Sequence, residues 1–126
     1  MVEALSLDEL RRYAFKRRLK AADQIRKDYV QDVVLFIAYT VVYPKFLFKG
    51  GTAIWKLMKG NRFSEDLDLQ ADKRVNPAPE IARYLRYFGF ETTVLKERST
   101  KNTLFARLSV EAPAFGSTEI SIEVLC

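Results

Sequence analysis

The sequence contains no histidine and a single cysteine, Cys126, and both scarcities narrow its chemistry. One cysteine excludes a disulfide within the chain. Without histidine, a zinc site and a serine–histidine hydrolase are both disfavoured. Any acid–base or metal chemistry must therefore use carboxylates, which favour hard ions such as Mg²⁺.

Long apolar runs are also missing. No run approaches the roughly 18 apolar residues that a membrane helix needs. Residues 1–8 lack the basic-then-apolar pattern of a signal peptide. We therefore expect a cytoplasmic protein without membrane association.

What the chain does contain is enough apolar surface for a core. Of its 126 residues, 48% are apolar and 13% aromatic, which predicts one compact domain. The net charge is +5 and the pI about 9.4. A basic balance suggests a polyanionic partner but does not prove one.

The pattern of the chain predicts mixed helices and strands. Ser6-Leu7-Asp8-Glu9 is a capping box that should start a helix, and Tyr43-Pro44 should end a second one. We expect an α+β fold with a mixed or antiparallel sheet flanked by helices. It would form a single domain, with a helical hairpin over about 1–43 and a sheet core over about 45–126. The expected later elements are a short buried strand at 46–48, a helix at 52–58, a strand at 66–70, a helix at 77–88 ended by Gly89, and strands at 91–96, 103–110 and 119–125.

Two aspartates stand one residue apart in the expected strand 66–70. Residues i and i+2 of a strand share a face, so Asp66 and Asp68 project together while Leu67 and Leu69 enter the core. Two like charges this close repel each other unless a cation lies between them. The pair therefore predicts a divalent-metal site.

Gly50-Gly51 lies between an expected strand and helix. Glycine allows the backbone to approach a ligand closely, and a helix start offers free N–H groups to phosphate oxygens. Thr52 adds a hydroxyl, and positive charge nearby comes from Lys49, Lys56 and Arg62. The segment therefore predicts a phosphate cradle, and together with the aspartates it describes a nucleoside triphosphate site.

Phosphoryl transfer with two metal ions usually needs a third carboxylate. Glu123 lies between Ile122 and Val124 in the last expected strand, a pattern typical of an acid that projects into a site. Glu119 shares its face but lies farther along, so we favour Glu123.

Each feature alone has an ordinary structural explanation. A Gly-Gly pair is more often a tight turn, Asp-x-Asp a solvated strand face or a capping pair, and Glu123 an exposed strand residue. Their combination is more specific, because a strand, Gly-Gly-Thr, a helix, a short loop and Asp-Leu-Asp-Leu follow one another.

Residues 48–53 and 62–69 closely resemble the signature of the AbiEii/AbiGii toxin family, which belongs to the nucleotidyltransferase superfamily with the DNA polymerase β-like fold. Arg26-Lys27-Asp28-Tyr29-Val30 resembles the family's lead-in helix, and residues 71–126 match in general layout. The resemblance implies a toxin of a type IV toxin–antitoxin system that transfers nucleotides, in some relatives to the acceptor end of tRNA. It also implies an antitoxin partner.

The resemblance also implies residue roles. Two Mg²⁺ ions would be held by Asp66, Asp68 and Glu123, and Glu123 would help to activate the acceptor hydroxyl. The nucleotide would contact Lys49, Gly50, Gly51, Thr52, Arg62 and Ser64.

One departure stands out. Family members usually continue into a helical region that carries a lysine and an Arg-Asp-x-x-Asp stretch, whereas this chain stops at Cys126. Either the chain is a fragment, or it completes its site by oligomerisation.

The N-terminal helix is basic. Its cations could bind an RNA backbone, or they could form a solvated face that balances nearby acids, and we favour the second interpretation slightly. These cations are Arg11, Arg12, Lys16, Arg17, Arg18 and Lys20.

The main hypothesis is a magnesium-dependent nucleotidyltransferase with an RNA, possibly tRNA, or protein acceptor. A second hypothesis is a non-catalytic nucleotide- or nucleic-acid-binding module, and a third is a toxin fragment held by its antitoxin. Dependence on metal separates the first two, because backbone binding falls with salt but does not need Asp66 and Asp68.

Overall fold

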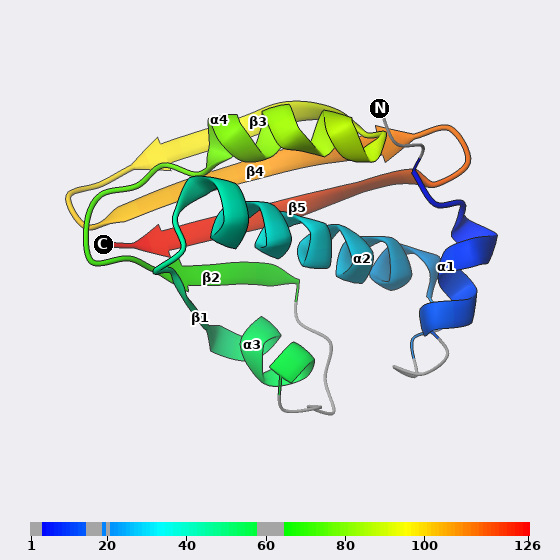
Figure 1. The fold of residues 1–126 in the computed structure, drawn as a ribbon, viewed down its shortest axis with the longest axis horizontal. Helices are drawn as coiled ribbons and strands as arrows, with labels where there is room; N and C mark the ends of the chain where they lie inside the picture. The colour runs from blue at the N-terminus through cyan, green and yellow to red at the C-terminus, as the bar shows by residue number, and fades with distance from the viewer. Residues whose placement is uncertain (1–3, 15–18, 20, 58–64) are drawn as a thin grey trace.

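The structure is a computed structural model that describes residues 4–14, 19, 21–57 and 65–126. Within these residues, helices and strands are mixed along the chain (Figure 1). The helical segments are α1 (Leu7–Ala14), α2 (Ala22–Ile37), the π-helical turn η2 (Ala38–Val42), α3 (Gly50–Leu57), α4 (Ala78–Leu85) and the 3-10 turn η3 (Arg86–Phe88). The strands are β1 (Leu47–Lys49), β2 (Asp66–Gln70), β3 (Glu91–Ser99), β4 (Thr103–Ala112) and β5 (Gly116–Leu125).

The described strands form one five-stranded sheet in the order β1-β2-β5-β4-β3. The last strand of the chain, β5, therefore lies in the middle of the sheet. It pairs in parallel with β2 and antiparallel with β4, and the other neighbours in the sheet are antiparallel. The sheet is mixed, as the sequence predicts.

The helices α2 and α4 lie over one face of the sheet (Figure 1). Beneath them, β4 and β5 bury every second side chain, including Leu108, Val110, Ile120 and Ile122. The alternate side chains of these strands point to the other face, which the described helices leave uncovered. This uncovered face carries the residues from which a site can be built.

Most element boundaries match their sequence patterns. The capping box forms as expected: Ser6 N–H donates to Glu9 Oε1, and Glu9 N–H donates to Ser6 Oγ, both at 3.1 Å. Gly89, with φ 88°, ends the helical segment α4–η3 in the left-handed region. These two local signals are therefore confirmed.

Two expectations need correction. The segment around β1 is not a fully buried strand, because Phe46 is buried but Leu47 is 62% exposed. Leu47 pairs with Gln70 and Lys49 with Asp68, so Leu47 lies on the face of the sheet that the helices leave uncovered. The following helix begins at Gly50 rather than Thr52, because Gly50 turns the chain directly from strand into helix.

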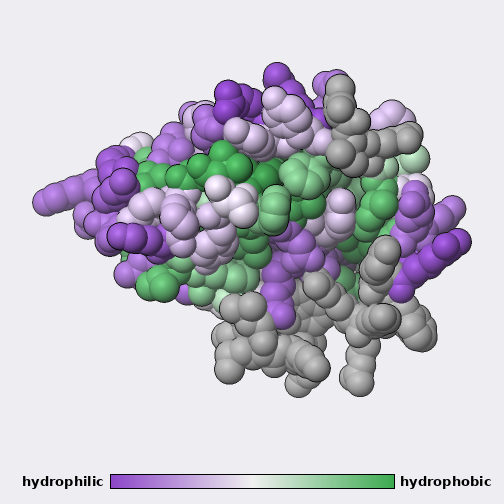
Figure 2. All heavy atoms as spheres, in the orientation of Figure 1, coloured by the Kyte–Doolittle hydropathy of each residue, from purple (hydrophilic) through white to green (hydrophobic). Residues whose placement is uncertain are grey.

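The helix-covered side of the molecule also exposes apolar side chains, and Figure 2 shows them gathered in a band across that side. The large ones are Phe36 on α2, Val41 on η2 and Tyr87 on η3. Phe36 makes an edge-to-face contact with Phe88 at a centroid distance of 6.2 Å. Among the described helices, none has the length and apolar character that a bilayer-spanning segment requires.

Candidate active site

The strand β2 separates the two kinds of side chain in Asp-Leu-Asp-Leu. Leu67 and Leu69 are fully buried, whereas Asp66 is exposed and Asp68 is partly exposed. The two leucines anchor the strand under the helices, so both carboxylates are directed to the uncovered face. The expected geometry of the aspartate pair is therefore confirmed.

The parallel pairing of β2 with β5 brings Glu123 to the same place. Asp68 lies directly opposite Glu123, and Asp66 lies opposite Ser121. Residues opposite each other in a sheet share a face, so all three carboxylates are on the uncovered side. Glu119 lies opposite Ser109 of β4, one step beyond Ser121 along that face. The register thus places Glu123, rather than Glu119, beside the aspartate pair.

Negative charge is crowded around Asp68, and this crowding affects the pKa of its carboxyl group. Partial burial and the nearby carboxylates of Glu123 and Asp66 raise the pKa of Asp68, and Lys49 opposes this effect. Lys49 lies opposite Asp68 on the other neighbouring strand, β1. A cation bound between the carboxylates would remove the repulsion that raises this pKa.

Gly50 brings the backbone close to the same carboxylate. It directly follows β1 and has φ 80°, a conformation that L side chains rarely adopt. A Cβ atom at this position would lie 2.4 Å from Asp68 Oδ2. The start of α3, with its free backbone N–H groups, therefore lies next to the carboxylates. Gly51 follows in the first turn of the same helix.

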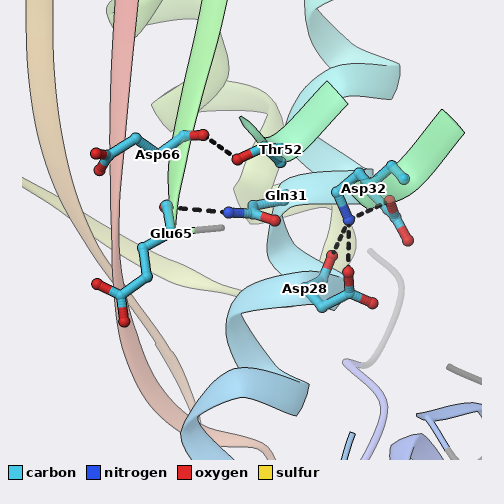
Figure 3. Close-up of polar contacts among 7 residues, drawn as sticks. Asp28, Gln31, Asp32, Thr52, Glu65 and Asp66 are labelled. Carbon is cyan, nitrogen blue, oxygen red and sulfur yellow. Dashed lines mark hydrogen bonds and ion pairs between the residues drawn. The ribbon is translucent and has the colours of Figure 1, made fainter. Parts of the chain in front are cut away.

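Two buried polar side chains hold the beginning of β2 (Figure 3). Gln31 of α2 donates from Nε2 to the backbone oxygen of Glu65 at 3.0 Å. The hydroxyl of Thr52 donates to the backbone oxygen of Asp66. Both side chains are fully buried, and in Figure 3 the carboxylate of Asp66 points away from the two helices.

These contacts refine the expected role of Thr52 and add a residue that sequence reasoning missed. The Thr52 hydroxyl donates to the protein backbone, so its side chain supports β2, the strand that carries the two aspartates. Gln31 carried one signal in the sequence: it is a polar residue between Val30 and Val33, within the buried part of α2. A polar group buried at such a position needs a hydrogen-bond partner, here the backbone that precedes β2.

Lys56 does not contribute free positive charge to a phosphate site, which corrects the sequence interpretation. Its Nζ lies 2.7 Å from Asp28 Oδ1 and 2.8 Å from Asp32 Oδ1, and its side chain is 5% exposed. It also donates to the backbone oxygen of Asp28 at 3.0 Å. The lysine therefore joins α3 to α2 and fixes the position of the helix that begins at Gly50.

The remaining expected contacts divide into two groups. Arg11 and Arg12 are exposed on α1. That helix lies beside the β4–β5 turn, where Leu7 N–H donates to the oxygen of Ala114 at 3.1 Å, and not among the carboxylates. The rest of the expected contacts lie outside the described residues: Arg62, Ser64, Lys16, Arg17, Arg18 and Lys20.

The carboxylates form an open arrangement rather than a closed metal cage. In the described part of the chain, no three His, Cys, Asp or Glu side chains form a group that could hold a metal ion. Mg²⁺ usually takes one or two carboxylates and completes its shell with substrate phosphates and water. The oxygen donors of Asp66, Asp68 and Glu123, with the raised pKa of Asp68, fit such a partial site.

Comparison with known proteins points to one family. Residues 37–124 match the family model described as nucleotidyl transferase AbiEii toxin, type IV TA system. No curated protein sequence matches the chain. The solved structure of MenT4, a nucleotidyltransferase toxin from Mycobacterium tuberculosis, is 27% identical, with a TM-score of 0.65.

Two Helicobacter pylori structures share the fold at lower identity. JHP933 is 14% identical with a TM-score of 0.65, and a putative nucleotidyltransferase is 15% identical with a TM-score of 0.63. The matches cover 97%, 85% and 85% of this chain, in the order MenT4, JHP933 and the putative nucleotidyltransferase. They cover only 44%, 45% and 46% of those chains, so this chain spans less than half the length of each.

Proposed function

Because the chain belongs to the AbiEii nucleotidyl transferase toxin family of type IV toxin–antitoxin systems, we propose that it transfers a nucleotide from a nucleoside triphosphate to an acceptor hydroxyl. The observation that carries this proposal is the register of β2 against β5, which sets Asp68 beside Glu123. The proposed acceptor is an RNA such as a tRNA, or a protein side chain.

The triphosphate side of the site is built from the strand-to-helix turn. Gly50 has no Cβ that would meet Asp68, so phosphate oxygens can approach the backbone there. The N–H groups of Gly50, Gly51 and Thr52 at the start of α3 suit an anion. Lys49, exposed and opposite Asp68, supplies positive charge. Arg62 and Ser64 are proposed to add contacts from outside the described residues.

The acceptor side of the site is proposed to be Glu123. Its carboxylate can accept the proton of the attacking hydroxyl, whose oxygen then bonds to the α-phosphorus as pyrophosphate leaves. Asp66 and Asp68 would hold Mg²⁺ together with Glu123. The bound ions would supply charge neutralisation for the phosphates and the leaving group. Gln31 and Thr52 keep the aspartates in position.

The partners follow from the family. A cognate antitoxin is proposed to bind this protein, and association of two copies is proposed as well. Because the proposed reaction uses nucleoside triphosphates, we propose that the protein acts in the cytoplasm.

The basic balance of the chain favours a second candidate function, a nucleotide- or nucleic-acid-binding module without turnover. Its supporting observation is the net charge of +5, which suits a polyanionic ligand. Such a module would bind without Mg²⁺, and its affinity would depend on salt rather than on Asp66 and Asp68.

The test is a calorimetric titration of the four nucleoside triphosphates with and without Mg²⁺. We expect Mg²⁺-dependent binding by the wild type and its loss in Asp66→Ala/Asp68→Ala. Glu119→Gln is the matched control for Glu123→Gln, because both residues are exposed acids on the same face of β5.

Transfer to total RNA and to total protein, followed with radiolabelled nucleotides, completes the test. Glu123→Gln should lower transfer by about 100-fold or more, within the range of general-base catalysis, and weaken nucleotide binding less than Asp66→Ala/Asp68→Ala does. Equal transfer by the wild type and Asp66→Ala/Asp68→Ala would refute the proposed catalytic role. Binding that ignores both Mg²⁺ and the aspartates would favour the module without turnover.

A further inference from the structure

The uncovered face of the sheet continues past the carboxylates onto β4 and β3. The pairing places Phe105 opposite Glu123, and Arg98 opposite Phe105. One step along, Arg107 lies opposite Ser121 and Lys96 opposite Arg107. Two rows of neighbouring residues therefore cross β5, β4 and β3 in that order. One consists of Glu123, Phe105 and Arg98, and the other of Ser121, Arg107 and Lys96. We call the four residues Lys96, Arg98, Phe105 and Arg107 the β3–β4 surface.

The side chains of the β3–β4 surface share the face of the carboxylates. Arg107 Nε donates to Ser121 Oγ at 3.4 Å, and Ser121 is the direct partner of Asp66. The guanidinium carbon of Arg98 lies 4.9 Å from the centroid of the Phe105 ring. Both contacts are made on the side of the sheet opposite to α2 and α4.

The cations of this surface form no ion pair among the described residues. Lys96 and Arg107 lie directly opposite each other, and like charges in that arrangement destabilise a sheet. Among the described residues, the ion pairs involve other cations, and none includes Lys96, Arg98 or Arg107. A phosphate backbone would neutralise these charges.

The aromatic component adds a second binding mode. Nucleic-acid bases stack on aromatic rings and on guanidinium planes, and such stacking tolerates any sequence. Phe105 and Arg98 offer both surfaces together, next to Glu123. Acids on the same face, Glu119 and Glu111, lie toward the β4–β5 turn. On β3 and β4, the cations therefore lie at the end of the sheet that also holds Glu123.

The order of the strands indicates which part of the reaction the β3–β4 surface serves. Gly50 and α3 lie on the β1 side of the carboxylates, and the β3–β4 surface lies on the β5 side. The triphosphate is proposed to occupy the first side, so an acceptor must approach Glu123 from the second. We propose that the β3–β4 surface binds the single-stranded end of a nucleic-acid acceptor and directs its terminal hydroxyl to Glu123. This inference rests on the proposed function for the direction of the acceptor.

The test measures binding of a fluorescein-labelled single-stranded RNA of twelve nucleotides by fluorescence anisotropy, without nucleotide or Mg²⁺. Phe105→Ala should weaken binding by roughly tenfold, as loss of one stacking platform does, and Phe105→Tyr should retain it. Arg107→Glu should weaken binding and reduce the slope of log K against log salt by about 1. Arg86→Glu, on η3 above the other face of the sheet, makes the same charge change as a matched control.

Wild-type binding that both Phe105→Ala and Arg107→Glu weaken, with Arg86→Glu unchanged, would support the proposal. Equal binding by Arg107→Glu and Arg86→Glu would overturn it, as would no binding of RNA by the wild type. Transfer to a protein acceptor that survives both surface variants would overturn it as well. Nucleotide titration of the same variants separates the two proposals, because failure of the β3–β4 surface leaves Mg²⁺-dependent nucleotide binding intact.

Discussion

At the scale of single residues, Asp68 lies in surroundings that disfavour its ionised carboxylate. Its partial burial and two neighbouring acids favour the protonated form, so its pKa lies above the usual range of an aspartate. The native state therefore keeps this proton to a higher pH than the unfolded chain does. Stability is lost as the pH rises through the raised pKa, and at neutral pH the ionised carboxylate disfavours the native state.

Asp68→Asn should therefore stabilise the protein at neutral pH while it removes nucleotide binding. We expect a gain in Tm of about 1–3 °C at pH 7.5, small because solvent screens a partly exposed group. The gain should shrink toward pH 4, because a raised pKa means that more of the wild-type carboxyl is protonated there than at pH 7.5. Thermal unfolding at both pH values measures this, and a gain that is equal at the two would contradict the electrostatic explanation.

A second prediction at the scale of single residues concerns Gly50. Gly50→Ala introduces a side chain at φ 80° with its Cβ 2.4 Å from Asp68 Oδ2, so both backbone and carboxylate must shift. We expect a loss of about 1–3 kcal/mol in the free energy of unfolding, measured in urea, together with loss of nucleotide binding.

Gly89→Ala is the matched control, because Gly89 has φ 88° but ends the α4–η3 segment. It should lose stability through the same backbone strain and keep nucleotide affinity. If both variants bound the nucleotide equally well, the approach of Gly50 to Asp68 would have no part in binding.

At the scale of elements, the start of β2 depends on donors from two helices. Thr52→Val keeps the shape of the side chain but removes the hydroxyl that donates to the Asp66 oxygen. We expect a cost of about 1–3 kcal/mol, because a buried acceptor loses its partner. The turnover number should fall about tenfold, with a smaller change in KM, because the carboxylates shift while the phosphate cradle remains.

Thr52→Ser supplies the control for that prediction. It restores the hydroxyl and should recover most of the turnover number, although it loses a buried methyl group worth about 1 kcal/mol. If Thr52→Ser were as slow as Thr52→Val, packing rather than the hydrogen bond would be the cause.

The elements also show which parts of the fold local sequence can predict. The capping box at Ser6, the stop at Gly89 and the alternation of Leu104 to Val110 are decided by neighbours in the chain, and each is confirmed. The expectation for Leu47 is wrong because its exposure depends on which face of the sheet the helices cover, and Leu47 lies on the uncovered one. Lys56 was misjudged because its partners, Asp28 and Asp32, lie on another helix.

At the scale of the whole molecule, the pairing of β2 with β5 is a feature that local sequence patterns do not predict. The alternation of β5 indicates that Glu123 points away from the core. It does not say which strand β5 joins, because strand order is set by long-range pairing. The parallel register between Asp68 and Glu123 joins residues far apart in the chain. The three carboxylates therefore come together only because the last strand of the chain, β5, lies in the middle of the sheet beside β2.

The central place of β5 also predicts where the molecule is most rigid. β5 has a neighbour on both sides and buries Ile120, Ile122 and Val124, whereas β3 pairs with β4 alone and exposes nearly all its side chains. In hydrogen–deuterium exchange, the amides of β5 should exchange only through global unfolding, and those on the outer edge of β3 should exchange much faster.

Two substitutions test the same difference in local stability between β5 and β3. Ile122→Ala removes a fully buried side chain and should cost about 2–5 kcal/mol, whereas Val94→Ala, at a position that is 41% exposed, should cost about 0.5 kcal/mol. Because Glu123 and Asp68 stand on paired strands that each have a neighbour on both sides, we expect their spacing to be set before any ligand binds. Comparable exchange in β5 and β3 would mean that the carboxylates are not held in place by the sheet, and ligand binding would then have to order them.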